Sequence, residues 1–202
     1  MTPGRSWARI TTVTHRASED VDLIRRFLAG DTAAFDDIMR AHEDRVFGIC
    51  LRMLRDRNEA LDATQETFLT VFRKADRYRA EAAFSTWLYR VAVNTCYDLL
   101  RRQKRRSADP LPQGHDPADD AAADELASVE IRPDIEDALA RVQSEFRGAV
   151  VLVDLQGLSL ETAAEILGVP IGTVKSRVYR GRRVLAEHLG NLRSTSEHQR
   201  DD

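Results

Sequence analysis

Apolar residues recur every three or four positions over most of the chain, which is the spacing of helices that bury one face. From Glu19 this pattern predicts a first helix that ends at Gly30, and Asp31 is expected to cap a second, longer helix. The predicted inward residues are Val21, Ile24, Phe27 and Leu28 of the first helix, and Phe35, Ile38, Met39, His42, Val46, Ile49, Cys50 and Met53 of the second. We interpret His42 as a core or boundary residue with a partner, not as a ligand.

A third helix is expected from about Glu59 to Ala75, after a break at 56–58. Its inner stripe is predicted to be Leu61, Thr64, Phe68, Val71, Phe72 and Ala75. The outer positions are then Asp62, Gln65, Glu66, Leu69 and Arg73. An exposed leucine framed by acids and an amide is a candidate protein-docking face, although charged outer faces are normally only solvated.

A charged, irregular segment, Lys74 to Phe84, leads to a fourth helix. It places Tyr78 between two arginines, and a loop of this kind can bind phosphates and receive an unstacked base. Ser85 is expected to cap the helix. The residues predicted to face inward are Phe84, Trp87, Leu88, Val91, Thr95 and Leu99. Those predicted to face outward are Thr86, Tyr89, Arg90, Asn94 and Tyr97. This outer face suits single-stranded DNA. A helix end whose basic residues complement the dipole is an alternative of equal weight.

The segment from Ser159 to Leu185 carries the sharpest local signals. Ser159 can cap a short helix from about Leu160 to Leu167, Gly168 supplies a left-handed stop, and Pro170 limits the turn to a few residues. The inward residues are predicted to be Leu160, Ala163, Ala164 and Leu167, then Ile171, Val174, Val178, Gly181 and Leu185 in the helix that follows. This is a helix-turn-helix pattern, in which the second helix enters the major groove of DNA.

The outer face of that second helix is polar and cationic. It consists of Thr173, Lys175, Ser176, Arg177, Tyr179, Arg180, Arg182 and Arg183. The residues near its N-terminus, Thr173, Ser176 and Arg177, could reach base edges, whereas the later arginines are expected to meet phosphates. The alternative is a solvated basic helix packed on a neighbour. The turn chemistry, the alanine pair and the one-sided charge together favour DNA binding.

A chain of 202 residues with 43% hydrophobic content can hold two small domains, each with a core. We expect an all-α fold with two helical domains, at 19–106 and 133–192, the second opened by a proline. Disordered tails are expected at 1–18 and 193–202. The linker at 107–132 is rich in Ala, Asp and Pro and lacks an apolar period, so it should be flexible and acidic.

The net charge of −3 averages over an uneven distribution. The segment 101–106 carries five basic residues in six, whereas 107–131 carries seven acidic residues and no Lys or Arg. A protein that bound DNA unaided would usually be basic overall. The mild acidity therefore indicates DNA contact confined to patches and assisted by a partner.

Several site classes are excluded by the residues present. Cys50 and Cys96 are too few for a zinc site, and the five histidines show no metal-binding spacing. Both cysteines are expected to be buried free thiols, with a regulatory disulfide as the less favoured reading. We expect no catalytic residue, no metal and no cofactor. Neither a membrane span nor a signal peptide is found, so a cytoplasmic protein without membrane insertion is expected.

Three motifs in this order and spacing resemble those of a known family: DATQETFLTVFRKADRY, then FSTWLYRVAVNTCYDLLRRQKRR, then GLSLETAAEILGVPIGTVKSRVYRGRRVL. They are similar to the extracytoplasmic-function (ECF, group IV) class of bacterial RNA polymerase sigma factors, over roughly 20–189. The resemblance implies a helical sigma2 domain followed by a helical sigma4 domain. Leu61 and Thr64 depart from the family pattern, where an acid and an aliphatic residue are common.

The resemblance also implies a role for each surface. It implies docking of core RNA polymerase, through the β′ clamp coiled coil, on Asp62, Gln65, Glu66 and Leu69, and a contact with the β flap. It implies binding of minus-10 promoter DNA by Arg77, Tyr78, Arg79, Phe84, Ser85, Thr86, Trp87, Tyr89, Arg90 and Asn94. It implies binding of minus-35 promoter DNA by Thr173, Lys175, Ser176, Arg177, Tyr179, Arg180 and Arg183. By the same resemblance, the linker threads into the polymerase active-site cleft and RNA-exit channel, with a solubilising spacer as the alternative. The resemblance also implies control by an anti-sigma factor.

The implied activity is promoter selection and strand opening by binding, with no bond chemistry in this chain. Two alternatives remain at this point. A stand-alone helix-turn-helix repressor or activator would bind promoter DNA tightly without polymerase. An enzyme acting on nucleic acid would need clustered carboxylates or a metal set, which the sequence motifs do not provide.

Overall fold

The computed structural model describes the backbone of residues 7–108 and 133–198, and the side chains of 18–106 and 135–190. Every regular element in these ranges is helical. The elements are α1 (Trp7–Leu28), α2 (Ala33–Leu54), α3 (Arg57–Lys74), α4 (Phe84–Ala108), α5 (Pro133–Arg141), α6 (Ser144–Val150), α7 (Leu160–Leu167) and α8 (Ile171–His198). A 3-10 turn (Ala75–Arg77) follows α3, and a π-helical turn (Val151–Leu155) continues α6. The predicted all-α fold with two helical units is confirmed, while most of the linker lies outside the described residues.

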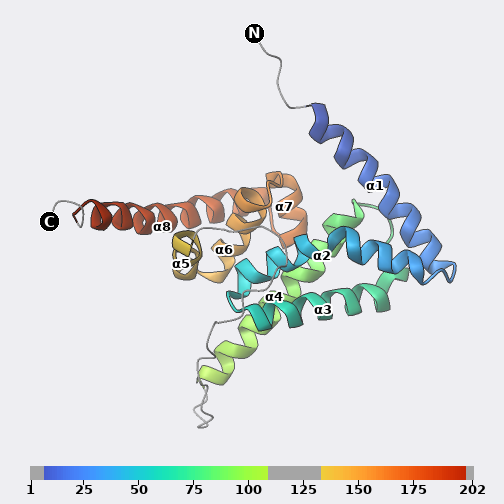
Figure 1. Cartoon of the computed structure of the whole chain (residues 1–202), viewed down its shortest axis with the longest axis horizontal. Coiled ribbons are helices and arrows are strands. Elements are labelled where there is room, and N and C mark those ends of the chain that lie inside the picture. The colour runs from blue at the N-terminus through green and yellow to red at the C-terminus, as the bar shows by residue number, and fades with distance from the viewer. Residues whose placement is uncertain (1–6, 109–132, 199–202) are drawn as a thin grey trace.

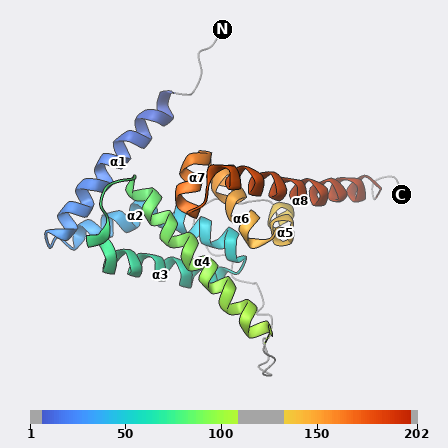
Figure 2. The same cartoon turned by 180° about the vertical axis from the view of Figure 1, so that it is seen from behind.

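The first unit is built on α2, α3 and α4, which pack on one another, whereas α1 extends away from this bundle toward its N-terminal end (Figure 1). The second unit consists of α5 to α8, and its last helix also projects outward (Figure 1). Seen from behind, α4 crosses the molecule diagonally and α7 lies beside it (Figure 2). The two units therefore touch in this structure.

Helix α1 begins well before the predicted first helix. Its backbone is helical from Trp7, within the stretch 1–18 that was predicted to be a disordered tail, and residues 1–6 lie outside the described part. No Gly or Pro interrupts this stretch, and a helix fixed at one end can extend by one hydrogen bond per residue. Near the C-terminal end of α1, Ile24 is buried as predicted. Leu28 was also predicted to face inward, but it is 51% exposed.

A buried pair of side chains joins α1 to α2. Nε2 of His42 lies 2.9 Å from Oδ1 of Asp20, and both side chains are almost fully buried. This confirms the interpretation of His42 as a core histidine with a partner. The sequence pattern could not identify Asp20 as that partner, because the two residues are on different helices.

Removing the buried carboxylate should destabilise the fold. We expect Asp20→Ala to lower the free energy of unfolding by about 1–3 kcal/mol, because a buried imidazole loses its hydrogen-bond partner. Asp22→Ala is the matched control. Asp22 forms an exposed pair with Arg25 at 3.3 Å, and such pairs contribute at most about 1 kcal/mol. Urea unfolding followed by circular dichroism measures both, and equal losses would contradict the assigned role of Asp20.

Helix α2 buries the stripe that its periodicity predicts. Ile38, Ile49 and Met53 are at most 1% exposed. The start of the helix differs from the prediction, because Thr32 occupies the N-cap position. The carboxylate of Asp31 instead pairs with Arg26 at 2.6 Å, and this hydrogen bond lowers the pKa of Asp31.

Helix α3 buries a stripe that is rotated from the predicted one. The buried residues are Ala60, Ala63, Thr67, Phe68 and Val71. Leu61 and Phe72 were expected inside, but they are 38% and 47% exposed, so this part of the prediction is wrong. Three of these buried residues, Ala60, Ala63 and Thr67, are small. Phe72 lies at the edge of the bundle, with its ring 4.9 Å from that of Phe27 and 5.1 Å from that of Phe35.

The two cysteines are fully buried free thiols, as predicted. Cys50 lies on α2 and Cys96 on α4, and the thiols meet where these helices pack. A hydrogen bond with Cys50, together with burial, raises the pKa of Cys96. The same hydrogen bond lowers the pKa of Cys50, so it shifts the pKa values of the two thiols in opposite directions.

The second unit begins at Pro133 as predicted, and Leu139, Val142 and Val150 are almost fully buried. Two details of the helix-turn-helix core differ from the prediction. Ile166 of α7 was not assigned to the core and is fully buried, whereas Ile171 was assigned to it and is 36% exposed. Periodicity within one helix does not reveal such differences, because burial here also depends on the other helices that pack against α7 and α8.

Gly181 allows α8 to pack closely on α6. A Cβ atom at this position would lie 2.5 Å from Cγ2 of Val150 and 3.3 Å from the carbonyl oxygen of Phe146. Any side chain would push the two helices apart. The predicted burial of Gly181 is confirmed.

In the described parts of the chain, no helix combines the length and the apolar character needed to cross a membrane. Within the same residues, no group of three or more His, Cys, Asp or Glu side chains could hold a metal ion.

Candidate protein and nucleic-acid interfaces

The outer face of α3 combines acidic and exposed apolar side chains. Its four predicted docking residues are all exposed: Asp62, Gln65, Glu66 and Leu69. Leu69 is 48% exposed, and Leu61 and Phe72 extend the apolar surface beside it. A groove of about 360 Å³ runs between α2 and α3 next to Leu69, with Phe35, Met39, Phe68 and Phe72 in its lining. Exposed apolar surface with a polar rim is typical of protein-binding sites.

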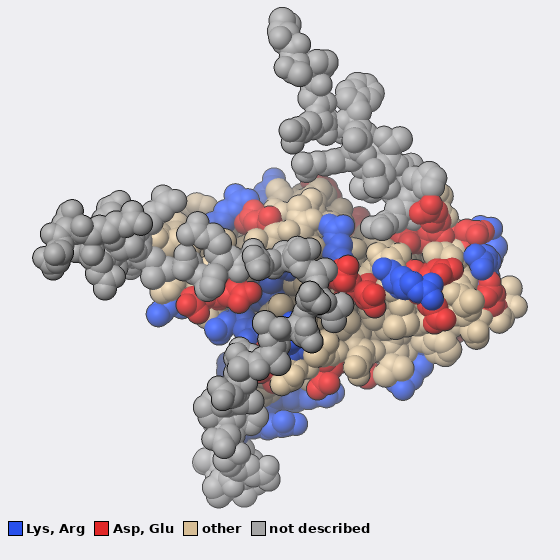
Figure 3. All heavy atoms as spheres, viewed as in Figure 1, with Lys and Arg blue, Asp and Glu red and all other residues tan. Residues whose placement is uncertain are grey.

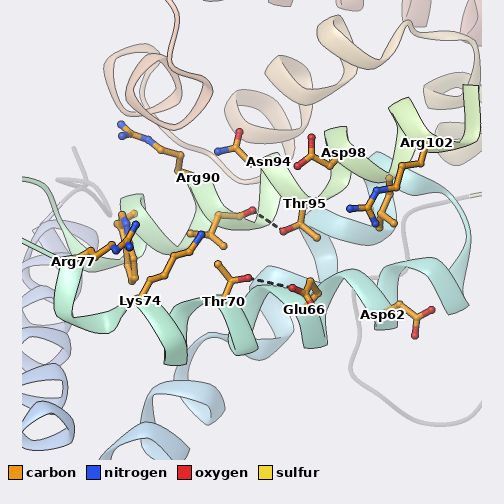
Figure 4. Close-up of a pocket in the computed structure, with 13 residues that line it drawn as sticks. Asp62, Glu66, Thr70, Lys74, Arg77, Arg90, Asn94, Thr95, Asp98 and Arg102 are labelled. Atoms are coloured by element: carbon orange, nitrogen blue, oxygen red, sulfur yellow. Dashed lines mark hydrogen bonds between the residues drawn. The ribbon is translucent and has the colours of Figure 1, made fainter. Parts of the chain in front are cut away.

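A larger cleft, of about 710 Å³, lies between α3 and α4 (Figure 4). Asp62 and Glu66 line it from α3, and Glu66 accepts a hydrogen bond from Thr70 at 3.4 Å. Lys74 and Arg77 lie at the end of the cleft next to the loop (Figure 4). The cleft therefore connects the acidic outer face of α3 with the basic surface that precedes α4.

The loop between α3 and α4 is held by its own aromatic residues. Tyr78 donates its hydroxyl to the carbonyl oxygen of Ala82 at 2.8 Å. Its ring lies 5.4 Å from that of Phe84 and 5.7 Å from that of Trp87. Burial raises the pKa of Tyr78, so its phenol stays protonated at neutral pH. The two flanking arginines, at 77 and 79, are exposed beside this fixed set of rings.

Three residues predicted to contact minus-10 DNA are buried. Phe84 is 0% exposed, Thr86 5% and Tyr89 3%. Thr86 and Tyr89 were expected to face outward, which this structure contradicts. Both α1 and α7 pack against α4, so more of its circumference is covered than a helix with one buried face would have. Helix α4 also begins at Phe84, which places Ser85 inside the helix and not at its cap.

Arg90 and Asn94 of α4 are exposed, as predicted. Arg90 donates from Nη2 to the carbonyl oxygen of Glu165 in α7 at 2.5 Å. The end of α4 is strongly basic, with exposed Arg101, Arg102, Lys104, Arg105 and Arg106. Figure 3 shows Lys and Arg side chains gathered toward the lower edge, where α4 ends. A surface of this kind suits a phosphate backbone.

The helix-turn-helix forms where the sequence predicts it. Oγ of Ser159 accepts a hydrogen bond from the N–H of Thr162 at 3.1 Å and so caps α7. Gly168 ends α7 in the left-handed conformation with φ of 64°. Helix α8 then starts at Ile171, directly after Pro170. Val174 and Val178 anchor it in the core at 0% and 4% exposure.

The predicted minus-35 residues share the outer face of α8. Lys175, Ser176, Tyr179, Arg180 and Arg183 are exposed, while Thr173 and Arg177 are half-buried. Tyr179 is 71% exposed. One of the expected phosphate contacts is directed elsewhere, because Arg182 pairs with Asp154 of the π-helical turn at 2.5 Å. Arg183 also has a surface partner, Glu187, at 2.9 Å.

The structure therefore brings the predicted docking residues together on α3 and the predicted minus-35 residues together on α8. The minus-10 set is divided. Arg77, Arg79, Arg90 and Asn94 are exposed, whereas Phe84, Thr86 and Tyr89 belong to the packed interior. Phe72 was predicted to face inward and is instead a surface residue. Its aromatic neighbours, at 27 and 35, lie on other helices, so the periodicity of α3 carried no signal for this contact.

Comparisons with known proteins match both units. Residues 38–106 match the family model of Sigma-70 region 2, and residues 133–185 match that of Sigma-70, region 4. The ECF RNA polymerase sigma factor SigM of Mycobacterium tuberculosis is 40% identical over 173 residues, covering 86% of each chain. SigE of Mycolicibacterium smegmatis is 39% identical over 166 residues, and the match spans 79% of this chain but 64% of SigE.

Two solved structures share the fold. CnrH in complex with the cytosolic domain of CnrY has a TM-score of 0.62 at 20% identity, covering 86% of this chain and 98% of that chain. The sigma factor RpoE in complex with the anti-sigma factor NepR from Bartonella quintana has a TM-score of 0.61 at 24% identity, covering 77% and 96%. With both sigma-70 regions matched in order and a 40% identical relative covered over most of its length, the chain belongs to the ECF RNA polymerase sigma factors, transcription initiation factors that are not enzymes.

Proposed function

We propose that this sigma factor uses three separate surfaces: the outer face of α3 for core RNA polymerase, the loop before α4 with the exposed part of α4 for minus-10 DNA, and α8 for minus-35 DNA. The observation that carries this proposal is that each kind of side chain gathers on its own helix. Acidic and apolar residues gather on α3, while exposed cationic residues lie on α4 and α8 of two different units. Two weak DNA-binding surfaces gain effective concentration when one partner holds both.

The docking proposal rests on Leu69 and its neighbours. A half-exposed leucine beside a groove, flanked by Asp62, Gln65 and Glu66, offers an apolar contact with a polar rim. The proposed partner is the β′ clamp coiled coil, and the second unit would contact the β flap. The carboxylates would then select a basic partner surface.

The minus-10 proposal is narrower than the sequence prediction. Arg77 and Arg79 flank a fixed aromatic set that includes Tyr78 and Trp87, which supports phosphate binding next to a stacking surface. Arg90 and Asn94 extend this surface along α4. Phe84 would act by supporting the loop from inside. Capture of an unstacked base would offset part of the few kcal/mol that strand opening requires.

Regulation by an anti-sigma factor is also proposed, with the protein acting in the cytoplasm alongside polymerase. One of the similar solved structures is a sigma factor bound to an anti-sigma factor. The exposed apolar edge of α3 is a surface that polymerase and such an inhibitor would compete for.

Transcription in vitro from a random promoter library tests the proposal. Core polymerase with this protein should select transcripts that share a minus-35 and a minus-10 element, while core polymerase alone should not. Size-exclusion chromatography should show the protein bound to core polymerase. A protein that binds promoter DNA tightly without polymerase, and adds no start-site selectivity, would instead be a stand-alone regulator.

Arg177→Ala should relax minus-35 specificity. The side chain lies near the N-terminus of α8, where a bidentate contact with a base contributes about 1–3 kcal/mol of discrimination at one position. Arg183→Ala is the matched control, because a phosphate contact changes affinity about equally for all sequences. Competition binding of holoenzyme to minus-35 variants measures both. A uniform loss for Arg177→Ala would make Arg177 a phosphate contact.

A further inference from the structure

The loop before α4 contains a residue with an unfavourable backbone conformation. Ala80 has a φ of 56°, in the left-handed region. This conformation is rare for a residue with a Cβ atom, because Cβ then lies too close to the following carbonyl oxygen. Arg55 also has a positive φ, but it caps the C-terminal end of α2, where the left-handed conformation is common. Ala80 does not end a helix, so another part of the loop must hold it in this conformation.

Backbone hydrogen bonds anchor the two ends of this loop but not its middle. The N–H of Tyr78 donates to the carbonyl oxygen of Ala75 at 3.1 Å, and the N–H of Thr86 donates to that of Ala83 at 2.9 Å. Within the described part of the chain, residues 79–82 take part in no hydrogen bond between two backbone groups. The backbone by itself therefore does not determine the conformation of Ala80.

The side chain of Tyr78 closes the loop around Ala80. Its hydroxyl group donates to the carbonyl oxygen of Ala82 at 2.8 Å, so one hydrogen bond joins the residues two positions before and after Ala80. The ring of Tyr78 lies almost perpendicular to that of Phe84, at 84°, and contacts Trp87 on α4. These ring contacts hold the hydroxyl group in place opposite its acceptor.

The conformation of Ala80 affects the groups proposed to bind minus-10 DNA. Arg79 and Glu81, on either side of Ala80, are exposed. Lys74 and Arg77 line the neighbouring end of the cleft between α3 and α4 (Figure 4). A change of φ at Ala80 would rotate Glu81 and the residues after it relative to Arg79. The shape of the loop tip, which we define as residues 79–81, thus depends on the left-handed conformation.

Direct stacking of a base on Tyr78 is the alternative role for this residue. The ring is half-buried and already contacts Phe84 and Trp87, which leaves less of its surface for a base. The two roles differ in the atoms that they require. Stacking depends on the aromatic ring, whereas closing the loop depends on the hydroxyl group.

We propose that Tyr78 is a positioning residue for minus-10 recognition: its hydrogen bond to Ala82 holds Ala80 in the left-handed conformation and so keeps the loop tip in the shape that receives an unstacked base. This inference rests on the proposed role of the loop in minus-10 binding. It assigns the hydroxyl group a role that the ring alone does not fulfil.

Tyr78→Phe in the full chain tests the proposal, because it keeps the ring and removes the hydroxyl group. Trypsin should cleave the free protein after Arg79 about 5-fold faster, since the loop leaves its closed form more often. Holoenzyme with Tyr78→Phe should bind a single-stranded oligonucleotide, carrying the minus-10 element from the promoter selection, about 5-fold or more weakly. This loss corresponds to a binding form reduced to about a fifth of the population. Binding to core polymerase and to duplex minus-35 DNA should stay at the wild-type level.

A second substitution identifies Ala80 as the residue through which the hydroxyl group acts. Tyr78→Phe with Ala80→Gly should bind the oligonucleotide within about 2-fold of wild type, because glycine adopts positive φ without steric cost. Tyr78→Phe with Ala83→Gly is the matched control. Ala83 is exposed next to the loop and does not have a positive φ, so glycine there should not restore binding.

Several results would overturn the proposal. Wild-type oligonucleotide binding by Tyr78→Phe would leave only the ring with a role. Restoration by both glycine variants, or by neither, would show that the hydroxyl group does not act through Ala80. Equal losses of minus-10, minus-35 and polymerase binding would indicate a general loss of structure. Failure of the wild-type holoenzyme to prefer the minus-10 oligonucleotide over a scrambled one would instead contradict the proposed function, on which the trypsin result does not depend.

Discussion

Leu69→Asp is expected to weaken binding to core RNA polymerase by about 30-fold or more, which corresponds to about 2 kcal/mol. Leu69 is 48% exposed, so the fold does not depend on its burial, and it borders the groove between α2 and α3. A carboxylate at this position would have to be desolvated against the partner and would add to the charge of Asp62 and Glu66. Fluorescence anisotropy with labelled protein and core enzyme measures the dissociation constant.

The control for Leu69→Asp is Leu28→Asp. Leu28 is a leucine of α1 with 51% exposure that lies outside the proposed docking residues. The Leu28→Asp variant should bind core polymerase with an affinity within a few-fold of wild type. In the absence of core polymerase, both variants should bind isolated minus-35 DNA with the same affinity. Equal loss of polymerase and minus-35 binding by Leu69→Asp would argue against docking through α3.

Phe84→Ala should lower the free energy of unfolding by about 3–5 kcal/mol. The side chain is fully buried and supports the loop before α4, with ring centroids 5.4 Å from Tyr78 and 5.8 Å from both Trp87 and His42. Phe72→Ala is the comparison, because Phe72 is 47% exposed and should have a clearly smaller effect. Chemical unfolding of the full chain measures both.

Phe84 can also be tested without a large loss of stability. Phe84→Leu keeps an apolar side chain in the core, so the fold should persist. If Phe84 only supports the loop, this variant should open minus-10 DNA nearly as well as wild type. A large loss of strand opening by a stably folded Phe84→Leu protein would restore the predicted direct contact with DNA.

Local signals in the sequence predicted local structure accurately. Ser159 and Gly168 were expected to begin and end α7, and both perform these roles in the structure, because capping depends on a few neighbouring residues. The stripe of α3 was misplaced for a related reason. Large apolar residues such as Leu61 and Phe72 dominated the pattern, while the residues that α3 buries include the small Ala60, Ala63 and Thr67. Periodicity identifies an amphipathic helix more reliably than it identifies which side lies deepest.

Contacts between distant segments were beyond sequence reasoning. Arg147 and Met53 are 94 positions apart, and neither residue type indicates that a cation binds the end of α2. The burial of Thr86 and Tyr89 has a similar origin, since α1 and α7 both pack against α4. The candidate docking and minus-35 faces were predictable because each lies on one helix. The divided minus-10 set was not, because it depends on packing between elements.

Gly181 has a consequence for redesigning promoter preference. There is no room for a side chain at this position between α8 and α6. The close contact at Gly181 therefore determines how α8 is placed on its supporting helix. Substitutions on the outer side can then alter which base pairs are favoured while the helix keeps the same pose in the groove. New DNA targets should be obtainable from libraries that randomise only the outward positions of α8, provided that residue 181 stays glycine.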